Sequence, residues 1–318
     1  MHYAYPPRKD SHSTPFRPRR SHLPVVRRSH LKTIILLGLG IIGLIWLFSG
    51  SKHKGARPIT GKPRVVLVTV FEDKYQNTAY SQVIKDNRLR YAEKHGYGTF
   101  IAKAGDYDLD GAPDSWSKVV AMRHALTKFP NCEYVWFLDQ HALVMSPESR
   151  VEEHVMGASK LEEMMLKDQP IVPPESIIKT FSHIKARDVD LVITQDKDGL
   201  ATSSILLRNG EWAKFFLDTW FDPLYRSYNF QKAETHALEH IVQWHPTILS
   251  KLAIVPQRAI NAYSSVEHGA QYGEGDIAVV FAQCSDTGIK SCANEAEQYS
   301  QRWRASFGVN QQHGRLGG

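Results

Sequence analysis

Cysteine is scarce in this sequence, and the usual metal-binding motifs are missing. Only 3 of the 318 residues are Cys, too few for a disulfide-rich miniprotein. There is no His-Glu-x-x-His sequence and no Cys pair with zinc-finger spacing, which excludes the common zinc motifs. Hydrophobic residues make up 42% of the chain and charged residues 23%, so the chain is not disordered throughout. This composition predicts one large domain, or two small ones, with a well-buried core.

An excess of positive charge is also missing from most of the chain. The sequence has 39 Lys and Arg against 33 Asp and Glu. Residues 1–32 contain 8 basic residues and one acidic residue, which leaves 31 basic and 32 acidic residues in the rest. A nucleic-acid-binding domain usually carries its charge on the folded part. We therefore expect no nucleic-acid partner and interpret residues 1–32 as a disordered basic tail.

Residues 33–50 are uncharged and almost entirely apolar. A helix of this length spans about 27 Å, enough for a thin bilayer. A cleaved signal peptide would have a shorter apolar run and a better cleavage site, and a buried core helix would have a polar face. Residues 38–43 match the dinucleotide fingerprint G-x-G-x-x-G, but the apolar run continues past them and basic residues follow. We predict a transmembrane signal-anchor.

The charges that flank this segment bear on its orientation. Five Lys or Arg lie within about fifteen residues on each side, a tie under the positive-inside rule. The basic residues of the whole tail favour a cytosolic N-terminus. The predicted order is a cytosolic tail at 1–32, the anchor at 33–50, a short stem at 51–63, a luminal domain at 64–304 and a flexible end at 305–318.

Strand and helix patterns alternate along the predicted luminal domain. Apolar, β-branched runs predict strands at 64–70, 99–102, 134–138, 190–194, 203–207, 252–255 and 277–281. Helices are predicted at 76–95, ending at Gly96, at 115–129, opened by a Ser cap, and at 211–226 and 234–244. Such alternation indicates an α/β fold with a parallel sheet. Ligands bind these sheets beyond the carboxyl ends of the strands.

Two acidic turns follow predicted strands. Asp139-Gln140-His141 comes directly after 134–138, where a carboxylate and an imidazole could hold a divalent cation that neutralises a nucleotide diphosphate. In the alternative interpretation, Asp139 only caps the next segment and His141 is exposed. The loop 195–199 is the second turn, and its Asp-Gly sequence has an equally good conformational explanation.

Polar residues on two predicted helices are further candidates. Trp116, Lys118 and Arg123 lie at the start of helix 115–129, where cations could meet phosphates or simply be solvated. Glu234 begins helix 234–244, which also carries His residues. The spacing is not that of a zinc motif, and a helix with one polar face is the alternative.

The three cysteines fall into two groups. Cys284 and Cys292 are eight residues apart in a loop rich in Gly, Ser and Asp. In an oxidising compartment we expect a disulfide between them, which leaves Cys132 free.

Short segments spread over residues 64–300 resemble the fungal Golgi glycosyltransferases of family 34. In order they are Asn87–Tyr97, Trp116-Ser-Lys118 with Arg123, Pro130–Ala142, Gln195–Gly199, Leu207-Arg-Asn209, Val255–Asn261, Gly275-Asp276 and Phe281–Cys284. The family includes α-1,6-mannosyltransferases of mannan assembly and α-galactosyltransferases, with plant xylosyltransferase relatives. The mannosyltransferase branch is the most similar.

The resemblance implies a type II Golgi membrane enzyme with a luminal GT-A fold, a nucleotide-sugar donor and retained configuration at the sugar carbon. It implies Mn²⁺ at an Asp-x-Asp position, with Asp139 and His141 as ligands. It implies donor or acceptor contacts from Arg88, Trp116, Lys118, Arg123, Gln140, Asp196 and Gly199. It also implies catalytic roles for Asp198 and Glu234.

Three positions depart from the family pattern. His141 replaces the second Asp, and an imidazole can bind Mn²⁺ but adds no negative charge. Val280 stands where a family His is expected, and Gln283 replaces a Gly. Either Asp139, His141 and the donor diphosphate hold the cation, or the chain has lost efficient catalysis.

Taken together, the residues and the resemblance predict an α-1,6-mannosyltransferase. It would transfer mannose from GDP-mannose to mannan or N-glycan acceptors, together with other mannosyltransferase subunits in the Golgi membrane. One alternative is an α-galactosyltransferase that uses UDP-galactose. Another, motivated by His141 and Val280, is a non-catalytic subunit of a mannan polymerase complex.

Overall fold

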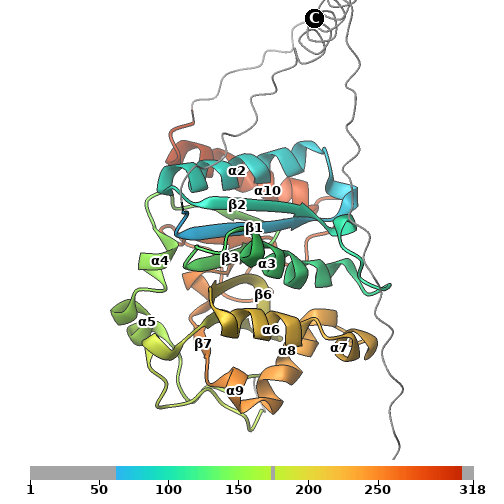
Figure 1. The fold of residues 1–318 in the computed structure, drawn as a ribbon. Helices are drawn as coiled ribbons and strands as arrows, with labels where there is room; N and C mark the ends of the chain where they lie inside the picture. Colours follow the sequence, from blue (N-terminus) through green and yellow to red (C-terminus); the bar gives the residue numbers. More distant parts are fainter. Residues whose placement is uncertain (1–61, 173–175, 310–318) are drawn as a thin grey trace, which may run out of the picture. The chain divides into compact units, whose positions relative to one another are not determined.

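A computed structural model describes residues 62–172 and 176–309 (Figure 1). The predicted tail and anchor, nearly all of the stem, and residues 310–318 lie outside this part. Within the described ranges, no helix is both long enough and apolar enough to cross a membrane.

A six-stranded sheet forms the centre of the described part, in the order β2-β1-β3-β6-β5-β7. Its strands are β1 (Val65–Phe71), β2 (Gly98–Lys103), β3 (Tyr134–Leu138), β5 (Leu191–Asp196), β6 (Gly199–Arg208) and β7 (Leu252–Val255). They match the predicted runs to within a few residues. Alternate residues of β1 enter different cores, Val66 and Val68 on one face and Val65 and Leu67 on the other, as the pleat of a strand requires.

The predicted parallel sheet is wrong at β6. This strand is antiparallel to both β3 and β5, whereas β1 pairs in parallel with β2 and β3. The reason is the connection between β5 and β6, which consists of Lys197 and Asp198 alone. Two residues can close an antiparallel hairpin, but a parallel pair needs a crossover of a dozen residues or more.

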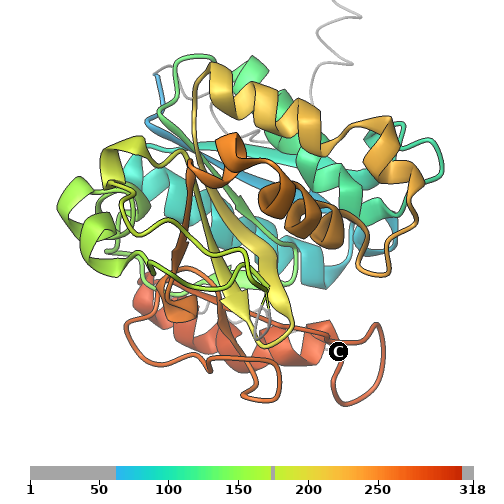
Figure 2. The same cartoon turned by 90° about the horizontal axis from the view of Figure 1, so that it is seen from below.

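Helices cover both faces of the sheet. One face packs against α3 (Ser117–Lys128), α6 (Glu211–Trp220) and α8 (Ala233–Trp244), and the other against α2 (Ala79–His95), α4 (Val151–His154) and α5 (Ala158–Met164). Seen from below, α6 and α8 lie on one side of the strands and α10 (Cys292–Ser306) on the other (Figure 2). The remaining helices are α7 (Pro223–Ser227) and α9 (Pro246–Leu249).

Helix ends confirm one predicted cap and correct another. Gly96 ends α2 in the left-handed region, at φ 68°, as its sequence predicts. Helix α3 starts at Ser117 rather than Ser115, and no side chain caps it. A short 3₁₀ turn over Asp114–Trp116 precedes it, and the Ser117 hydroxyl closes this turn by donating to the Asp114 carbonyl.

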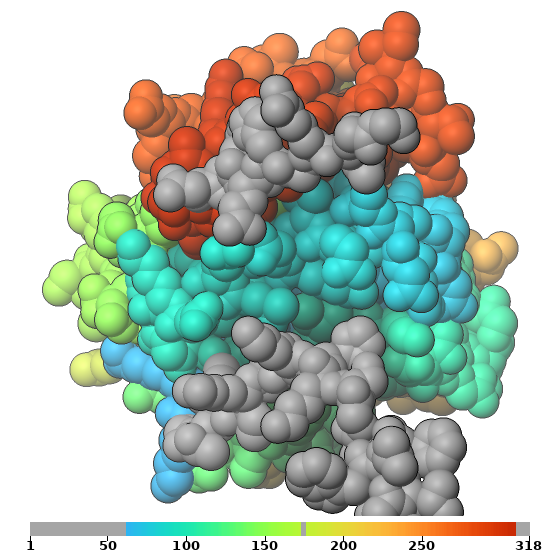
Figure 3. All heavy atoms as spheres, turned by 90° about the horizontal axis from the view of Figure 1, so that it is seen from above, coloured from blue at the N-terminus to red at the C-terminus, as the bar shows by residue number. Residues whose placement is uncertain are grey.

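A second, three-stranded sheet was predicted only in part. It contains β4 (Ala142–Val144), β9 (Ala278–Val280) and β8 (Ala262–Tyr263), in that order. The antiparallel pair of β4 and β9 places Val280 beside Ala142. No apolar run in the sequence predicts helix α10, which packs on α2 and β4. On the surface, α10 lies beside α2 (Figure 3). This sheet brings the loop 281–292 to the residues that follow β3.

Candidate active site

The turn Asp139-Gln140-His141 joins β3 to β4 at the carboxyl end of β3. The Asp139 backbone N–H donates to the Ser203 carbonyl (2.8 Å). Its carboxylate Oδ1 accepts from the His141 backbone N–H (2.8 Å). One carboxylate oxygen therefore closes the turn, as the capping interpretation of the sequence predicts.

Arg88 holds this turn from inside the protein. Its side chain is buried (1% exposed), and its guanidinium donates to Thr69 Oγ1 (3.2 Å) and to the carbonyls of Asp139 and Ala142 (both 2.9 Å). Burial lowers the pKa of Arg88 to about 9. Because its donors are engaged with the protein itself, Arg88 positions the turn and does not reach outward to a donor sugar.

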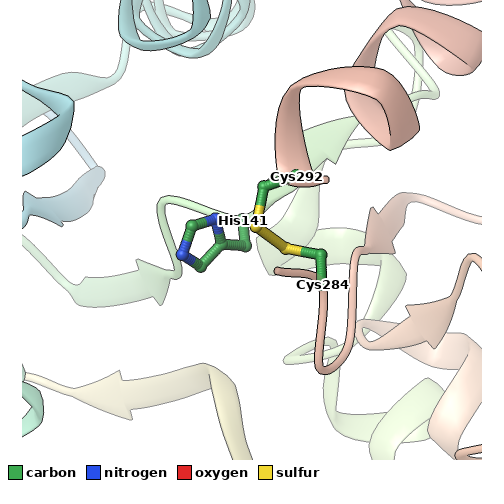
Figure 4. A group of neighbouring side chains, drawn as sticks. All are labelled: His141, Cys284 and Cys292. Carbon is green, nitrogen blue, oxygen red and sulfur yellow. A yellow bond between two sulfur atoms is a disulfide. The ribbon is translucent and has the colours of Figure 1, made fainter. Parts of the chain in front are cut away.

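His141 lies beside the disulfide of Cys284 and Cys292 (Figure 4). Two tyrosines and a glutamine are its other neighbours. Its Nδ1 is 2.8 Å from the Tyr80 hydroxyl, which donates to the Gln140 carbonyl (3.0 Å). Its Nε2 is 3.2 Å from Gln140 Nε2, a group that can only donate. These contacts assign the Nδ1–H tautomer of a neutral imidazole, with both ring nitrogens engaged.

The described residues do not fit the Mn²⁺ site that the resemblance implies. In residues 62–172 and 176–309, three potential ligands within 4.8 Å of one another are His141, Cys284 and Cys292. The two sulfurs form the predicted disulfide (S–S 1.98 Å), so neither is a thiolate ligand. Asp139 is not in this group, and Val280, beside Ala142 on β9, carries no ligand atom. Mn²⁺ prefers an oxygen-rich set, which this turn does not provide.

The third cysteine also behaves as predicted. Cys132 is free and buried. Burial raises the pKa of its thiol to about 11, which keeps it protonated and inert.

A lysine that the sequence does not single out lies next to the turn. Lys74 Nζ is 3.0 Å from Glu72 Oε2 and 2.9 Å from Asp286 Oδ1. Glu72 Oε1 in turn accepts from Gln140 Nε2 (2.7 Å). The hydrogen bond to Asp286 raises the pKa of Lys74. This ammonium group is half exposed (50%), but the carboxylates of Glu72 and Asp286 match its charge, so it adds no surplus positive charge to the site.

Lys118 and Glu234, predicted from separate helices, form a buried ion pair. Lys118 Nζ is 2.7 Å from Glu234 Oε1, with side chains only 10% and 5% exposed. Lys118 also donates to Thr202 Oγ1 on β6 (3.2 Å). Thr202 is the neighbour of Ser203, to which Asp139 is bonded. The pair therefore lies at the same edge of the sheet as the Asp139 turn.

The hairpin between β5 and β6 contains the other predicted acids. The Asp196 carboxylate accepts from the Asp198 backbone N–H (2.8 Å) and from the Tyr263 hydroxyl (2.7 Å). Gly199 has a φ of 133°, and a Cβ built there would lie 2.0 Å from Glu239 Oε1. The hairpin therefore needs Gly at this position, and Asp198 stands exposed at its tip.

Glu239 is a buried acid that sequence reasoning did not place in the site. Its Oε1 accepts from the Leu200 backbone N–H (2.9 Å), and burial raises its pKa. No spacing in the sequence reveals this contact, because it joins α8 to the start of β6.

Of the other predicted contact residues, Arg123 lies elsewhere and Trp116 is buried inside the protein. Arg123 pairs with Asp218 (2.9 Å) across the outer sides of α3 and α6, away from the Asp139 turn. Trp116 is buried (1% exposed), and its ring packs edge-on against Phe221.

Comparisons with known proteins agree on one family. The sequence profile of the galactosyl transferase GMA12/MNN10 family matches residues 61–291. An uncharacterized α-1,2-galactosyltransferase of Schizosaccharomyces pombe is 30% identical over 79% of this chain and 80% of its own length. An α-1,2-galactosyltransferase of the same organism is 31% identical over 74% of this chain and 65% of its own. The probable α-1,6-mannosyltransferase MNN11 of Saccharomyces cerevisiae is 30% identical over 77% and 63%.

A solved structure shares the fold. It is a glycosyltransferase involved in the glycosylation of the major capsid of PBCV-1, with a TM-score of 0.51 and 11% identity over 75% of this chain and all of that chain. The predicted fold class is confirmed as a mixed α/β fold of the GT-A kind.

Proposed function

Because the chain belongs to the galactosyl transferase GMA12/MNN10 family, as its sequence segments predict, we propose that it transfers mannose from GDP-mannose. The chain is a glycosyltransferase of this family; the donor, the linkage and the acceptor are the proposal. We propose an α-1,6 linkage to mannan or N-glycan acceptors, with retained configuration. The likeness to the mannosyltransferase MNN11 supports it.

One observation carries this proposal at the level of the site. The Asp139 turn and the Lys118–Glu234 pair lie at one edge of the sheet and are linked through Ser203 and Thr202. In α/β folds this edge is where substrates bind. A carboxylate turn beside a buried carboxylate–ammonium pair suits a reaction in which positive charge develops on the sugar and negative charge on a departing diphosphate.

The residues divide the chemistry as follows. Glu234, fixed by Lys118, places a carboxylate beside the reacting sugar carbon, where positive charge develops. The bond from that carbon to the phosphate oxygen breaks as the acceptor hydroxyl attacks from the same face, and the hydroxyl proton passes to the departing phosphate. Mn²⁺ is no part of this proposal, because the described residues do not fit it.

Two alternatives rest on specific observations. The galactosyltransferase relatives favour UDP-galactose as the donor. His141 and Val280 favour a non-catalytic subunit, in which another family member would supply the chemistry. We also propose a type II Golgi membrane protein with a luminal domain, working with other mannosyltransferase subunits.

Transfer by the full-length chain, purified in detergent, tests the proposal. The chain is incubated with GDP-mannose or UDP-galactose and an α-mannoside acceptor, with Mn²⁺ or with a chelator. We expect mannose transfer, and an Asp139→Asn variant should lose about tenfold or more in rate, because a charge next to the reacting groups is removed.

The matched control is Asp86→Asn, which should leave the rate unchanged. Asp86 is a half-exposed acid of α2 paired with Arg90. Transfer of galactose but not of mannose would mean that the donor is UDP-galactose and not GDP-mannose. A donor that binds but is never transferred, even with partner subunits added, would leave the non-catalytic subunit as the better account.

A further inference from the structure

A cavity of about 240 Å³ lies between the loop 109–116 and the segment 223–233. Six of the residues that line it are Asp110, Trp116, Tyr225, Arg226, Asn229 and Phe230. Its walls thus combine three aromatic rings with a carboxylate, an amide and a guanidinium. Such a mixture of apolar faces and a few polar groups is typical of small-molecule sites.

The charges of this cavity cancel. Arg226 is the cation of the lining, and its side chain is only 9% exposed. Its guanidinium donates to Asp110 Oδ2 (2.9 Å) and to the Leu109 carbonyl (3.0 Å) and lies over the Phe221 ring, 4.3 Å from its centre. With its charge matched by Asp110, the cavity has no surplus cation for a diphosphate. The charge balance therefore favours a neutral ligand.

The backbone around the cavity is held in an unfavourable conformation. Asp110, Asn229 and Ala233 have φ values of 51°, 48° and 41°, and all three line the cavity. They are half of the six residues other than Gly with positive φ in the described part. Asp and Asn tolerate this region, but at Ala233 it costs roughly 1–3 kcal/mol, and such strain concentrates at ligand-binding sites.

The cavity adjoins the site. Trp116 is two residues before Lys118 and Ala233 is next to Glu234, so both halves of the buried ion pair continue directly into its wall. A volume of about 240 Å³ is below the roughly 300–1,000 Å³ of pockets for drug-sized ligands. It suits one sugar ring and not a whole nucleotide sugar.

We propose that this cavity binds one hexose unit of the acceptor glycan. The proposal rests on the proposed function, which it deepens by giving the acceptor its own subsite. Tyr225 and Phe230 would contact the apolar face of the ring, and Asp110 and Asn229 would accept from and donate to its hydroxyls. The sugar of the nucleotide-sugar donor is also a hexose and could contact the same groups. It is attached to a diphosphate, however, and the cavity has no surplus cation to bind one.

Binding is tested with the full-length chain by ligand-observed NMR titration, with α-1,6-mannobiose, GDP and GDP-mannose as separate probes. The variants are Phe230→Ala, which removes a ring, and Asp110→Asn, which removes a charge. We expect either change to weaken mannobiose binding by about tenfold, the loss of one charge-assisted hydrogen bond or one stacked ring. GDP affinity should stay within twofold in Phe230→Ala, which leaves the ion pair of Arg226 and Asp110 intact.

Asp168→Asn is the matched control. Asp168 also has a left-handed backbone, at φ 55°, and is exposed but does not line the cavity, so its variant should bind mannobiose as the parent does. Thermal unfolding of each variant separates a lost contact from a lost fold.

Three results would overturn the inference. The first is unchanged mannobiose binding in both variants, and the second is no mannobiose binding by the parent chain, with or without GDP. The third is a loss of affinity for GDP or GDP-mannose in Phe230→Ala that parallels the loss for mannobiose, which would assign the cavity to the donor. Its failure is distinct from that of the proposed function. If the chain transfers sugar but the cavity variants bind mannobiose like the parent, only the acceptor subsite is wrong. If the variants lose mannobiose binding but the parent transfers no sugar, only the proposed enzymatic function is wrong.

Discussion

At the scale of single residues, some side chains around the Asp139 turn only hold it in place, and others are left to contact a substrate. Arg88 is fully committed to backbone carbonyls and to the side chains of Thr69 and Asn87. One oxygen of Asp139 closes the turn. That leaves the other Asp139 oxygen as a group that can face a substrate. His141, with both ring nitrogens engaged, completes the packing of the turn against the disulfide.

Gln283 gives a prediction at this scale. Its φ is 55°, a region in which a side chain costs about 1–2 kcal/mol and Gly costs little. Gln283→Gly should therefore raise the free energy of unfolding by about 0.5–1 kcal/mol, after the greater entropy of Gly in the unfolded chain is subtracted. Chemical denaturation of the full-length chain measures this change.

Gln82→Gly is its control. Gln82 is an exposed residue inside α2, where Gly should lower stability by about 1 kcal/mol. A loss of stability in both variants would mean that the side chain of Gln283 contributes more than its backbone costs.

At the scale of elements, the ion pair of Lys118 and Glu234 ties α3 to α8 across the start of β6. Its side chains are nearly inaccessible to water, and Thr202 supplies a further hydrogen bond to Lys118. The hairpin of β5 and β6 is fixed in the same way by α8, because Glu239 caps the Leu200 N–H. Helix α8 thus fixes both α3 and the start of β6 at the site through two buried carboxylates.

Removing one partner of the pair should be costly. Lys118→Met leaves the Glu234 carboxylate buried without its counter-ion, and we expect a loss of about 3–5 kcal/mol in the free energy of unfolding. The double variant Lys118→Met/Glu234→Leu should regain most of this loss, because two apolar side chains need no partner. Denaturant titration of the full-length chain gives both values.

Arg123→Met is the matched control on the same helix. Its pair with Asp218 is 35% and 60% exposed, so its loss should cost less than about 1 kcal/mol. Equal costs for Lys118→Met and Arg123→Met would contradict a special role for the buried pair.

At the scale of the whole molecule, two sheets and a disulfide-bearing loop converge on one turn. The large sheet supplies β3 and β6, the small sheet supplies β4 and β9, and α10 fixes the loop 281–292 from outside. Residues separated by well over a hundred positions, such as Tyr75 and Asp286, therefore meet there. The proposed anchor at residues 33–50, outside the described part, would attach the chain to a membrane.

The anchor gives a prediction for the full chain. Residues 33–50 are uncharged and long enough for a helix to cross a thin bilayer, so the chain should stay in the membrane pellet after alkaline carbonate extraction. A chain without these residues should appear in the supernatant. Protection of the C-terminal domain from added protease in sealed microsomes would support the luminal orientation. Full release of the intact chain at high pH would contradict the anchor.

The sequence by itself determined the family, the strands of the large sheet, the helices α2, α3, α6 and α8, and the disulfide. These depend on local patterns: β-branched runs for β1 and β3, the Gly96 cap for α2, and the two cysteines in one loop. It also located the departures at 141, 280 and 283, because they stand inside recognisable segments. Local pattern is enough wherever the physical cause lies within a few residues.

Tertiary structure alone decided what those residues contact. The antiparallel direction of β6, the pairing of Lys118 with Glu234, the caging of Lys74 and the cavity behind Trp116 all join segments far apart in the chain. No spacing specifies such contacts, because they depend on how sheets and helices pack in three dimensions. The same packing engages both ring nitrogens of His141 and places Val280 beside Ala142. These contacts do not fit the metal site that the family motif implies.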